Sequence, residues 1–119
     1  MIKSLNQFEP DPDGFYDVCL FSDLKEKVGK KFFVNDTEIA LFKIENKIYC
    51  LSNICPHQHS AIIYSGFIED DCVVCPAHGW KFNLTDGKKE SGSKGLDSFE
   101  TKIVDNIVRV KVVQKKYSW

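Results

Sequence analysis

Three dipeptides that suit tight hairpin turns recur along the chain, each between two short apolar stretches. They are Glu45-Asn46, Asp70-Asp71 and Asp105-Asn106. Asn and Asp tolerate the positive φ angles that two-residue hairpin loops require. Short apolar stretches separated by such turns at close spacing are typical of antiparallel strands. The sequence therefore predicts an all-β chain, a small sandwich or barrel built mainly from hairpins.

The apolar patterns give bounds for the expected strands. These are residues 16–20, 31–34, 37–44, 47–52, 66–69, 72–75, 80–84, 99–104 and 107–113. Side chains alternate across a strand, so Trp80, Phe82 and Leu84 are expected on one buried face. Likewise, the valines at 108, 110 and 112 are expected to face inward, with Arg109 and Lys111 toward water. One helical turn is expected at 22–29, capped by Ser22 and ended by Gly29, and 88–98 is expected to be a loop.

Length and charge limit the function. A chain of 119 residues suits one domain, here 1–119, and its formal net charge is −1. Arg109 is the only arginine and no basic block occurs, which argues against nucleic acid as a partner. No apolar run has the length of a signal-peptide core or of a membrane span. We therefore expect a soluble, cytoplasmic protein without a membrane partner.

Two short segments combine cysteine, proline and histidine. The first is Cys55-Pro56-His57 and the second runs from Cys75 through Pro76 and Ala77 to His78, with 17 residues between His57 and Cys75. The chain has five cysteines, and an odd count without an export signal argues against a disulfide framework. Each segment follows a predicted strand, which places both at strand ends. A metal site is the favoured interpretation.

The donor types narrow the kind of metal site. Zinc sites usually take paired cysteines followed by paired histidines, and neither pairing occurs here. One cysteine and one histidine from each of two facing loops instead suit a [2Fe–2S] cluster with two Cys on one iron and two His on the other. Proline fixes φ after each cysteine. Gly79 is expected to allow close backbone approach beside His78.

One other ligand set stays open. Cys50, Cys55, Cys72 and Cys75 have a C-x4-C and C-x-x-C spacing, which would suit an all-cysteine [2Fe–2S] cluster or a structural zinc. That set leaves the repeated Cys-Pro…His pattern unexplained. Cys72 and Cys75 also invite a dithiol interpretation, although residues three apart on a strand face opposite ways. Cys19 and Cys50 are most simply buried apolar residues, and His59 is a surface residue, an alternative ligand or a proton relay.

These motifs resemble a known signature. Cys55-Pro56-His57, 17 residues, and then a second segment from Cys75 to Trp80 are similar to the signature of Rieske proteins. Residues 16–113 resemble soluble Rieske-type ferredoxins and the small subunits of assimilatory nitrite reductases. The resemblance implies a Rieske-like antiparallel sandwich or barrel with a small inserted cluster-binding subdomain at about 53–84. It also implies one [2Fe–2S] cluster held by Cys55, His57, Cys75 and His78.

The chain differs from the Rieske proteins of respiratory complexes. Those proteins have an extra cysteine in each loop, and the two form a disulfide. Here Ser60 and Ala77 occupy these positions, and Trp80 stands where those proteins carry a serine that hydrogen-bonds the cluster. The resemblance is therefore to the soluble, low-potential branch. A third loop covers the cluster in the family, and the corresponding stretch at 91–96 contains no proline.

The resemblance implies a function in electron transfer. The chain is expected to be a one-electron carrier that takes electrons from a reductase and passes them to a terminal oxygenase. A second hypothesis is the small subunit of an assimilatory NAD(P)H nitrite reductase, and a third is a regulatory module that responds to the cluster's state. No substrate turnover is expected from this chain alone. Its expected partners are redox proteins, namely a reductase and a terminal oxygenase or reductase.

Overall fold

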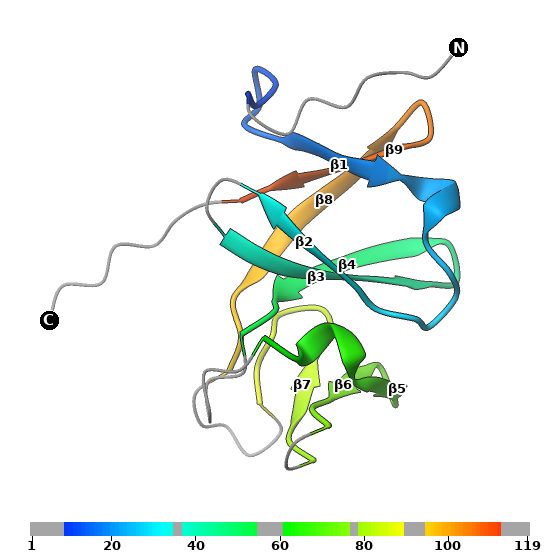
Figure 1. The fold of residues 1–119 in the computed structure, drawn as a ribbon, viewed down its shortest axis with the longest axis vertical. Coiled ribbons are helices and arrows are strands. Elements are labelled where there is room, and N and C mark those ends of the chain that lie inside the picture. Colours follow the sequence, from blue (N-terminus) through cyan, green and yellow to red (C-terminus); the bar gives the residue numbers. More distant parts are fainter. Residues whose placement is uncertain (1–8, 35–36, 55–60, 77–78, 90–94, 113–119) are drawn as a thin grey trace, which may run out of the picture.

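The protein is a β-structure of two antiparallel sheets (Figure 1). The computed structural model describes residues 9–34, 37–54, 61–76, 79–89 and 95–112. Its elements, in chain order, are β1 (Tyr16–Leu20), η1 (Phe21–Asp23), β2 (Lys30–Val34), β3 (Thr37–Ile44), β4 (Lys47–Ser52), η2 (Ile63–Ser65), β5 (Phe67–Glu69), β6 (Cys72–Val74), β7 (Lys81–Asn83), β8 (Ser98–Val104) and β9 (Ile107–Lys111). The all-β prediction is confirmed, and the strand bounds agree within two residues.

The three predicted hairpin turns all form. Each has two consecutive residues with positive φ: 50° and 66° at Glu45-Asn46, 50° and 61° at Asp70-Asp71, and 50° and 66° at Asp105-Asn106. They join β3 to β4, β5 to β6 and β8 to β9. Two successive left-handed residues match the right-handed twist of the flanking strands. Local turn chemistry therefore sets the register of these three strand pairs.

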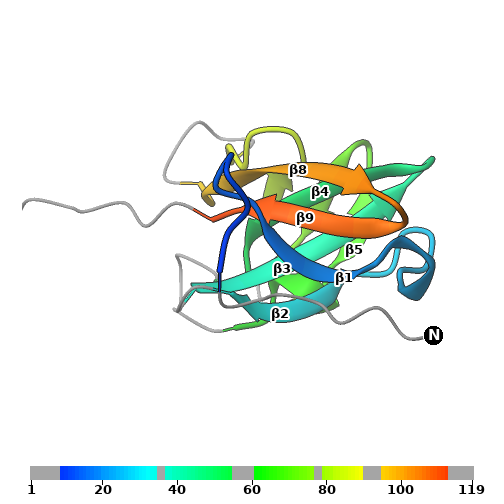
Figure 2. The ribbon, with the colours of Figure 1, turned by 90° about the horizontal axis from the view of Figure 1, so that it is seen from above.

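The larger sheet has six strands in the order β1-β9-β8-β4-β3-β2. Its neighbouring strands pair antiparallel, and its two edge strands, β1 and β2, contact each other. The sheet consequently curls into a near-barrel, as the view from above shows (Figure 2). A shift in register between Asp17 and Cys19 marks a bulge in β1. The extra residue bends this strand, which helps the sheet to curve.

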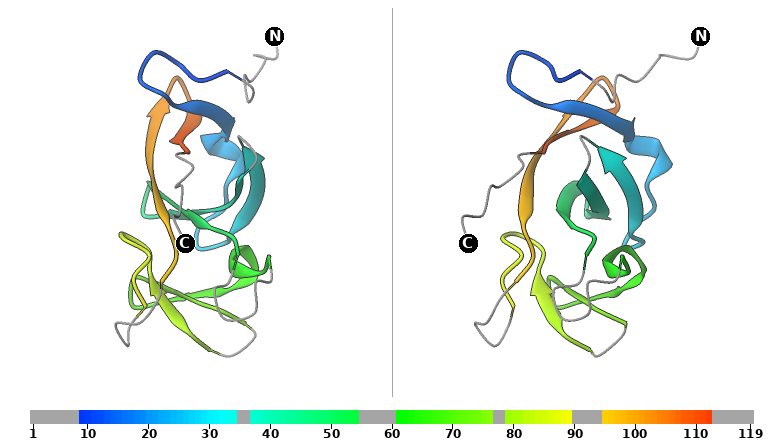
Figure 3. Two further views of the ribbon diagram at one scale, coloured as in Figure 1. Left: turned by 90° about the vertical axis from the view of Figure 1, so that its left-hand side faces the viewer. Right: turned by 60° about the vertical axis from the view of Figure 1, so that its left-hand side comes forward.

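The smaller sheet has the order β5-β6-β7 and lies beneath the larger one (Figures 1 and 3). Its strands fall inside 53–84, the range predicted for a cluster-binding subdomain. The assignment of that range as a separate subdomain stays a prediction. The two described helices, η1 and η2, have three residues each. In the part of the chain that the structure describes, no helix is long and apolar enough to cross a membrane.

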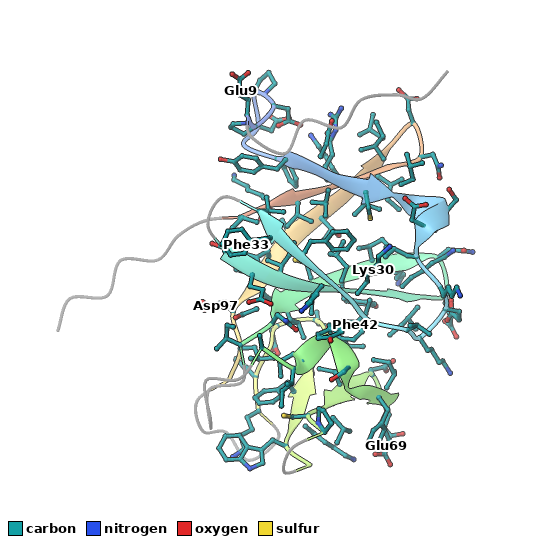
Figure 4. The ribbon with its side chains drawn as sticks, viewed as in Figure 1. Glu9, Lys30, Phe33, Phe42, Glu69 and Asp97 are labelled. Carbon is teal, nitrogen blue, oxygen red and sulfur yellow. The ribbon has the colours of Figure 1, made fainter. Side chains whose placement is uncertain are left out.

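Both faces of β3 and β4 are buried, in two different cores. Leu41 and Cys50 belong to the core inside the curled sheet. Phe42 and Leu51 belong to a second core, which includes Val73 from the smaller sheet. Figure 4 labels Phe42 on the side of β3 that faces η2. Alternation along two strands therefore joins the two sheets into one packed unit.

The predicted inward faces are confirmed. Phe82 and Leu84 are buried and Trp80 packs beside them, while the valines at 108, 110 and 112 are buried in the barrel core. Arg109 and Lys111 lie on the other side of β9 and are partly exposed. Arg109 binds Asp17 there through its Nε, at 2.7 Å.

The predicted helical turn at 22–29 is wrong beyond Asp23. Helix η1 covers only Phe21–Asp23, with Leu20 rather than Ser22 at its N-cap. After η1, Leu24 is extended, Glu26 forms a parallel bridge with Lys43, and the Lys27 N–H donates to the Lys43 carbonyl at 2.8 Å. Pairing with β3 thus replaces the local helical bonds. Helix η2 was not predicted.

Asn53 is a buried polar residue where β4 ends. Its side-chain amide donates to Glu38 Oε1 at 3.1 Å, and its side-chain oxygen accepts from the Tyr64 N–H at 2.7 Å. Its backbone N–H donates to the Glu38 carbonyl, and its carbonyl accepts from the Ile63 N–H. One side chain and its backbone thus tie β3 to η2, just before the first cysteine-histidine segment.

We expect Asn53→Ala to lower the free energy of unfolding by about 1–3 kcal/mol, because the Tyr64 N–H loses its acceptor. Urea titration followed by circular dichroism measures this loss. Asn83→Ala is the matched control, since Asn83 is exposed and its side chain accepts a local bond from the Thr85 N–H. Equal stability losses in the two variants would contradict the role of Asn53.

A charged network links the segment before β1 to β8 and β9. Asp11 binds Lys102 Nζ at 2.8 Å and Arg109 at 3.3 Å. The pKa of Asp11 is lowered from 3.8 to about 2, mainly by the hydrogen bond from Lys102 and then by the Phe15 backbone N–H. Because its pKa is lower in the folded state, ionised Asp11 stabilises the fold above pH 3.8. This contribution is lost as the pH falls toward 2.

The variant Asp11→Asn should therefore be less stable than the wild type at neutral pH. The difference should shrink as the pH falls from about 4 toward 2, where the wild-type carboxylate becomes protonated. Urea midpoints measured across this range test the prediction. Asp13→Asn is the control, because Asp13 is 78% exposed and lies 3.6 Å from Lys102. A stability difference that does not vary with pH would refute it.

Candidate metal centre

The first cysteine-histidine segment leaves and re-enters the fold at one place. Ile54 and Ala61 form an antiparallel bridge on either side of residues 55–60. The Ile54 N–H also donates to Ser52 Oγ at 3.4 Å. Asn53, the residue before Ile54, is held by its bonds to Glu38 and Tyr64. Cys55, His57 and His59 themselves lie outside the described residues. The structure thus shows a closed root for the segment that carries two of the predicted ligands.

The second segment is a tight hairpin loop with closed ends. The Cys75 N–H donates to the Trp80 carbonyl at 2.8 Å, and the Gly79 N–H donates to the Cys75 carbonyl at 2.9 Å. Cys75 is buried, whereas Pro76 and Gly79 are exposed. His78 lies outside the described residues. The hairpin therefore fixes Cys75 at the point where the loop leaves the core.

Gly79 is needed for its backbone conformation. Its φ is +74°, in the left-handed region that favours glycine. A Cβ built at Gly79 would meet nothing within 4 Å. Close backbone approach beside His78, the reason given from the sequence, stays a prediction, because His78 lies outside the described residues. The positive φ is what lets the chain turn back from Cys75 to Trp80.

Cys75 lies at the edge of the second core. The members of that core include Val73, Phe82 and Leu96, and Trp80 packs against it. The rings of Trp80 and Phe82 have centroids 6.4 Å apart with 50° between their planes. A thiolate ligand in this position has apolar neighbours on its inner side, which keeps water away. Cys75 therefore suits an iron ligand at the surface of a packed core.

A third loop is rooted next to the second. The Leu96 N–H donates to the Gly87 carbonyl at 2.7 Å, which closes the segment 88–95. A Cβ at Gly87 would overlap the Leu96 carbonyl, and one at Gly95 would overlap the Gly87 carbonyl. On its outgoing side, Lys89 bridges Phe82 in β7. The loop expected to cover the cluster thus begins alongside the strand that follows His78.

The all-cysteine alternative does not fit the described geometry. Cys50 belongs to the core inside the curled sheet, whereas Cys75 belongs to the second core. Cys72, Cys75 and Cys50 form no common group, and the described residues contain no cluster of three or more metal-ligating side chains. Burial raises the pKa of Cys50 well above its usual value and that of Cys19 to about 11. Both thiols therefore resist forming the thiolate that a metal binds.

Cys72 also differs from Cys75 in its surroundings. It lies on β6 between Glu69 and Asn83 of the neighbouring strands and is partly exposed. Cys75, three residues later, is buried in the core. This difference is what strand alternation predicts. It argues against a dithiol pair and makes Cys72 a useful comparison for Cys75.

Two residues near the site were missed by the sequence reasoning. Asn53 anchors the first loop, and Lys89 places its Nζ 3.1 Å from the ring centroid of Trp80. The only signal in the sequence for Asn53 was weak: it is a polar residue at the end of an apolar strand. No signal in the sequence pointed to Lys89, because its contact with Trp80 depends on how the third loop pairs with β7.

The chain is similar to known proteins over most of its length. The family model described as "Rieske [2Fe-2S] domain" matches residues 14–100. The ferredoxin component of the alkene monooxygenase system of Xanthobacter autotrophicus is 31% identical over 96 residues, which are 80% of this chain and 79% of the relative. The ferredoxin component of the naphthalene 1,2-dioxygenase/salicylate 5-hydroxylase systems of a Ralstonia species is 33% identical over 100 residues, covering 81% and 93%.

The fold is also found among solved structures. A nitrite reductase [NAD(P)H] small subunit from Erwinia carotovora aligns with a TM-score of 0.73 at 24% identity, covering 89% of this chain and 87% of that one. This likeness shows the fold. The family model covers more than half of the chain, and a family of this description carries one Rieske-type [2Fe–2S] cluster. The chain therefore belongs to the Rieske [2Fe–2S] domain family.

Proposed function

We propose that Cys55, His57, Cys75 and His78 hold the cluster and that the chain carries single electrons from a reductase to a terminal oxygenase. The observation that carries this proposal is the buried thiol of Cys75 at the root of a closed hairpin, together with a second closed root at Ile54–Ala61. The two ferredoxin relatives support the oxygenase partner, because the match covers most of each relative. We place the protein in the cytoplasm, where thiols stay reduced.

The donor set suits the cluster that the family carries. Two thiolates on one iron and two imidazoles on the other form a Rieske centre. When bound, such a centre supplies a one-electron couple. The chain's own residues fix the ligands: the hairpin bonds hold Cys75, and Asn53 anchors the strand that leads to Cys55. We expect a potential in the lower part of the Rieske range, because Trp80 replaces the hydroxyl that raises the potential in respiratory relatives.

Cysteine variants test the ligand set. Cys75→Ala should lose the cluster, so that iron and acid-labile sulfide fall to background. Cys72→Ala, three residues earlier on β6, should keep both. The reduced wild-type protein should give an electron paramagnetic resonance spectrum with the low average g of histidine ligation. A higher average g, typical of all-cysteine ligation, or full cluster content in Cys75→Ala, would refute the proposed ligands.

The nitrite reductase alternative rests on the shared fold with a small subunit of that enzyme. The two functions differ in the protein that accepts the electron. We expect the reduced chain to be reoxidised rapidly by a Rieske-type oxygenase component, and at least tenfold more slowly by a sirohaem nitrite reductase. Stopped-flow absorbance of the cluster measures both rates. A faster reaction with the nitrite reductase would favour the alternative.

A further inference from the structure

The root of the third loop holds an ammonium group against an aromatic ring. Lys89 Nζ lies 3.1 Å from the centroid of the Trp80 ring. The backbone of Lys89 forms an antiparallel bridge with Phe82, and the Asn83 N–H donates to the Lys88 carbonyl at 2.8 Å. These bonds fix the point from which the Lys89 side chain extends. Backbone pairing with β7 therefore helps to place Lys89 beside Trp80, in addition to the conformation of the lysine side chain.

The Lys89 ammonium group lies in a partly buried setting. Lys89 and Trp80 are both partly buried. Between described residues, lysine ion pairs join Lys81 to Glu69 and Lys102 to Asp11 and Asp13, and none of these pairs involves Lys89. A cation on the face of a tryptophan ring is held by the ring's quadrupole. Lys89 thus places its ammonium group against a partly buried ring.

Trp80 connects this charge to the second cysteine-histidine segment. Its carbonyl accepts the Cys75 N–H, and its ring packs against the core that contains Cys75. The same short hairpin carries His78. The ammonium group of Lys89 therefore lies beside the loop that supplies two of the four proposed ligands, on the side where the third loop begins.

We infer that Lys89 raises the reduction potential of the site, with Trp80 as the ring that holds its charge in place. This inference rests on the ligand set of the proposed function. One electron arriving from the reductase adds one unit of negative charge to the site. A nearby fixed cation stabilises that extra charge, and the effect is larger where water is partly excluded. Lys89 is thus a tuning residue, which acts on the site through its charge.

Lysine can also act through its stem, by covering the ring with methylene groups. The variant Lys89→Met separates the two roles, because methionine keeps an unbranched apolar stem and removes the charge. Lys89→Arg keeps the charge and can still lie over the ring. Lys88→Met removes a charge from the preceding residue, which is exposed. These variants form a matched set that changes charge and packing independently.

The experiment is voltammetry of the wild type and its variants, with electron paramagnetic resonance spectra of the same samples. We expect Lys89→Met to reduce the equilibrium constant for reduction by two- to tenfold, where tenfold equals about 59 mV for one electron. Lys89→Arg should stay within twofold of the wild type, and so should Lys88→Met. In a Trp80→Leu background, the effect of Lys89→Met should become smaller, because the ring no longer holds the charge.

The results separate two failures. A wild-type spectrum without the low average g of histidine ligation overturns the ligand set, and the tuning inference with it. A Rieske-type spectrum in all variants, with Lys89→Met at the wild-type potential, overturns only the role of Lys89. A shift in Lys88→Met as large as that in Lys89→Met would mean that general surface charge is responsible, and it would also overturn the inference.

Discussion

The structure depends on the burial of both faces of β3 and β4. Ile39 and Leu41 point into the curled sheet, whereas Ala40 and Phe42 point toward the smaller sheet, and all four are fully buried. A strand that is buried on one side only would leave the smaller sheet without a surface to pack on. Because hydrophobic burial is the main favourable term in folding, this shared pair of strands fixes the two sheets relative to each other. This packing also sets the position of the loops that leave the smaller sheet.

Backbone hydrogen bonds then hold the candidate metal centre. Each of the three loops is closed at its root by a main-chain pair: Ile54 with Ala61, Cys75 with Trp80, and Gly87 with Leu96. Main-chain closure leaves the side chains between the roots available for ligation. Asn53 adds a polar connection from β3 to η2, and its four hydrogen-bonding groups all have partners. The site is thus built on strand ends that main-chain hydrogen bonds hold together, which suits an electron carrier.

The charges are organised in two separate places. Asp11, Lys102 and Arg109 form a network on the barrel, where it links the segment before β1 to β8 and β9. Lys89 instead lies over Trp80, at the end of the second cysteine-histidine segment. The first arrangement ties strands together, and the second places a cation where electron transfer changes the charge. The Asp11 network therefore acts on the stability of the fold, whereas Lys89 is assigned to the reduction potential of the site.

Turns, strands and donor types were set by local sequence. Asp and Asn at the hairpin turns adopt positive φ because their own side chains permit it, and alternating residues such as Phe82 and Leu84 follow the period of any strand. The two Cys-Pro…His segments also indicated the family from local sequence, because the cysteine and the histidine of each segment lie only two or three residues apart.

Tertiary structure decided what depends on residues far apart in the sequence. Pairing of Lys27 with Lys43 replaced the helix expected after Ser22, because a bond to a distant strand displaced a local one. Asn53 was identified only by its contacts with Glu38 and Tyr64, and Lys89 only by the pairing of its loop with β7. The sequence by itself determined which residues could bind a cluster. Only the folded chain decided which groups anchor them and which charge lies beside them, because those contacts exist only once the strands have paired.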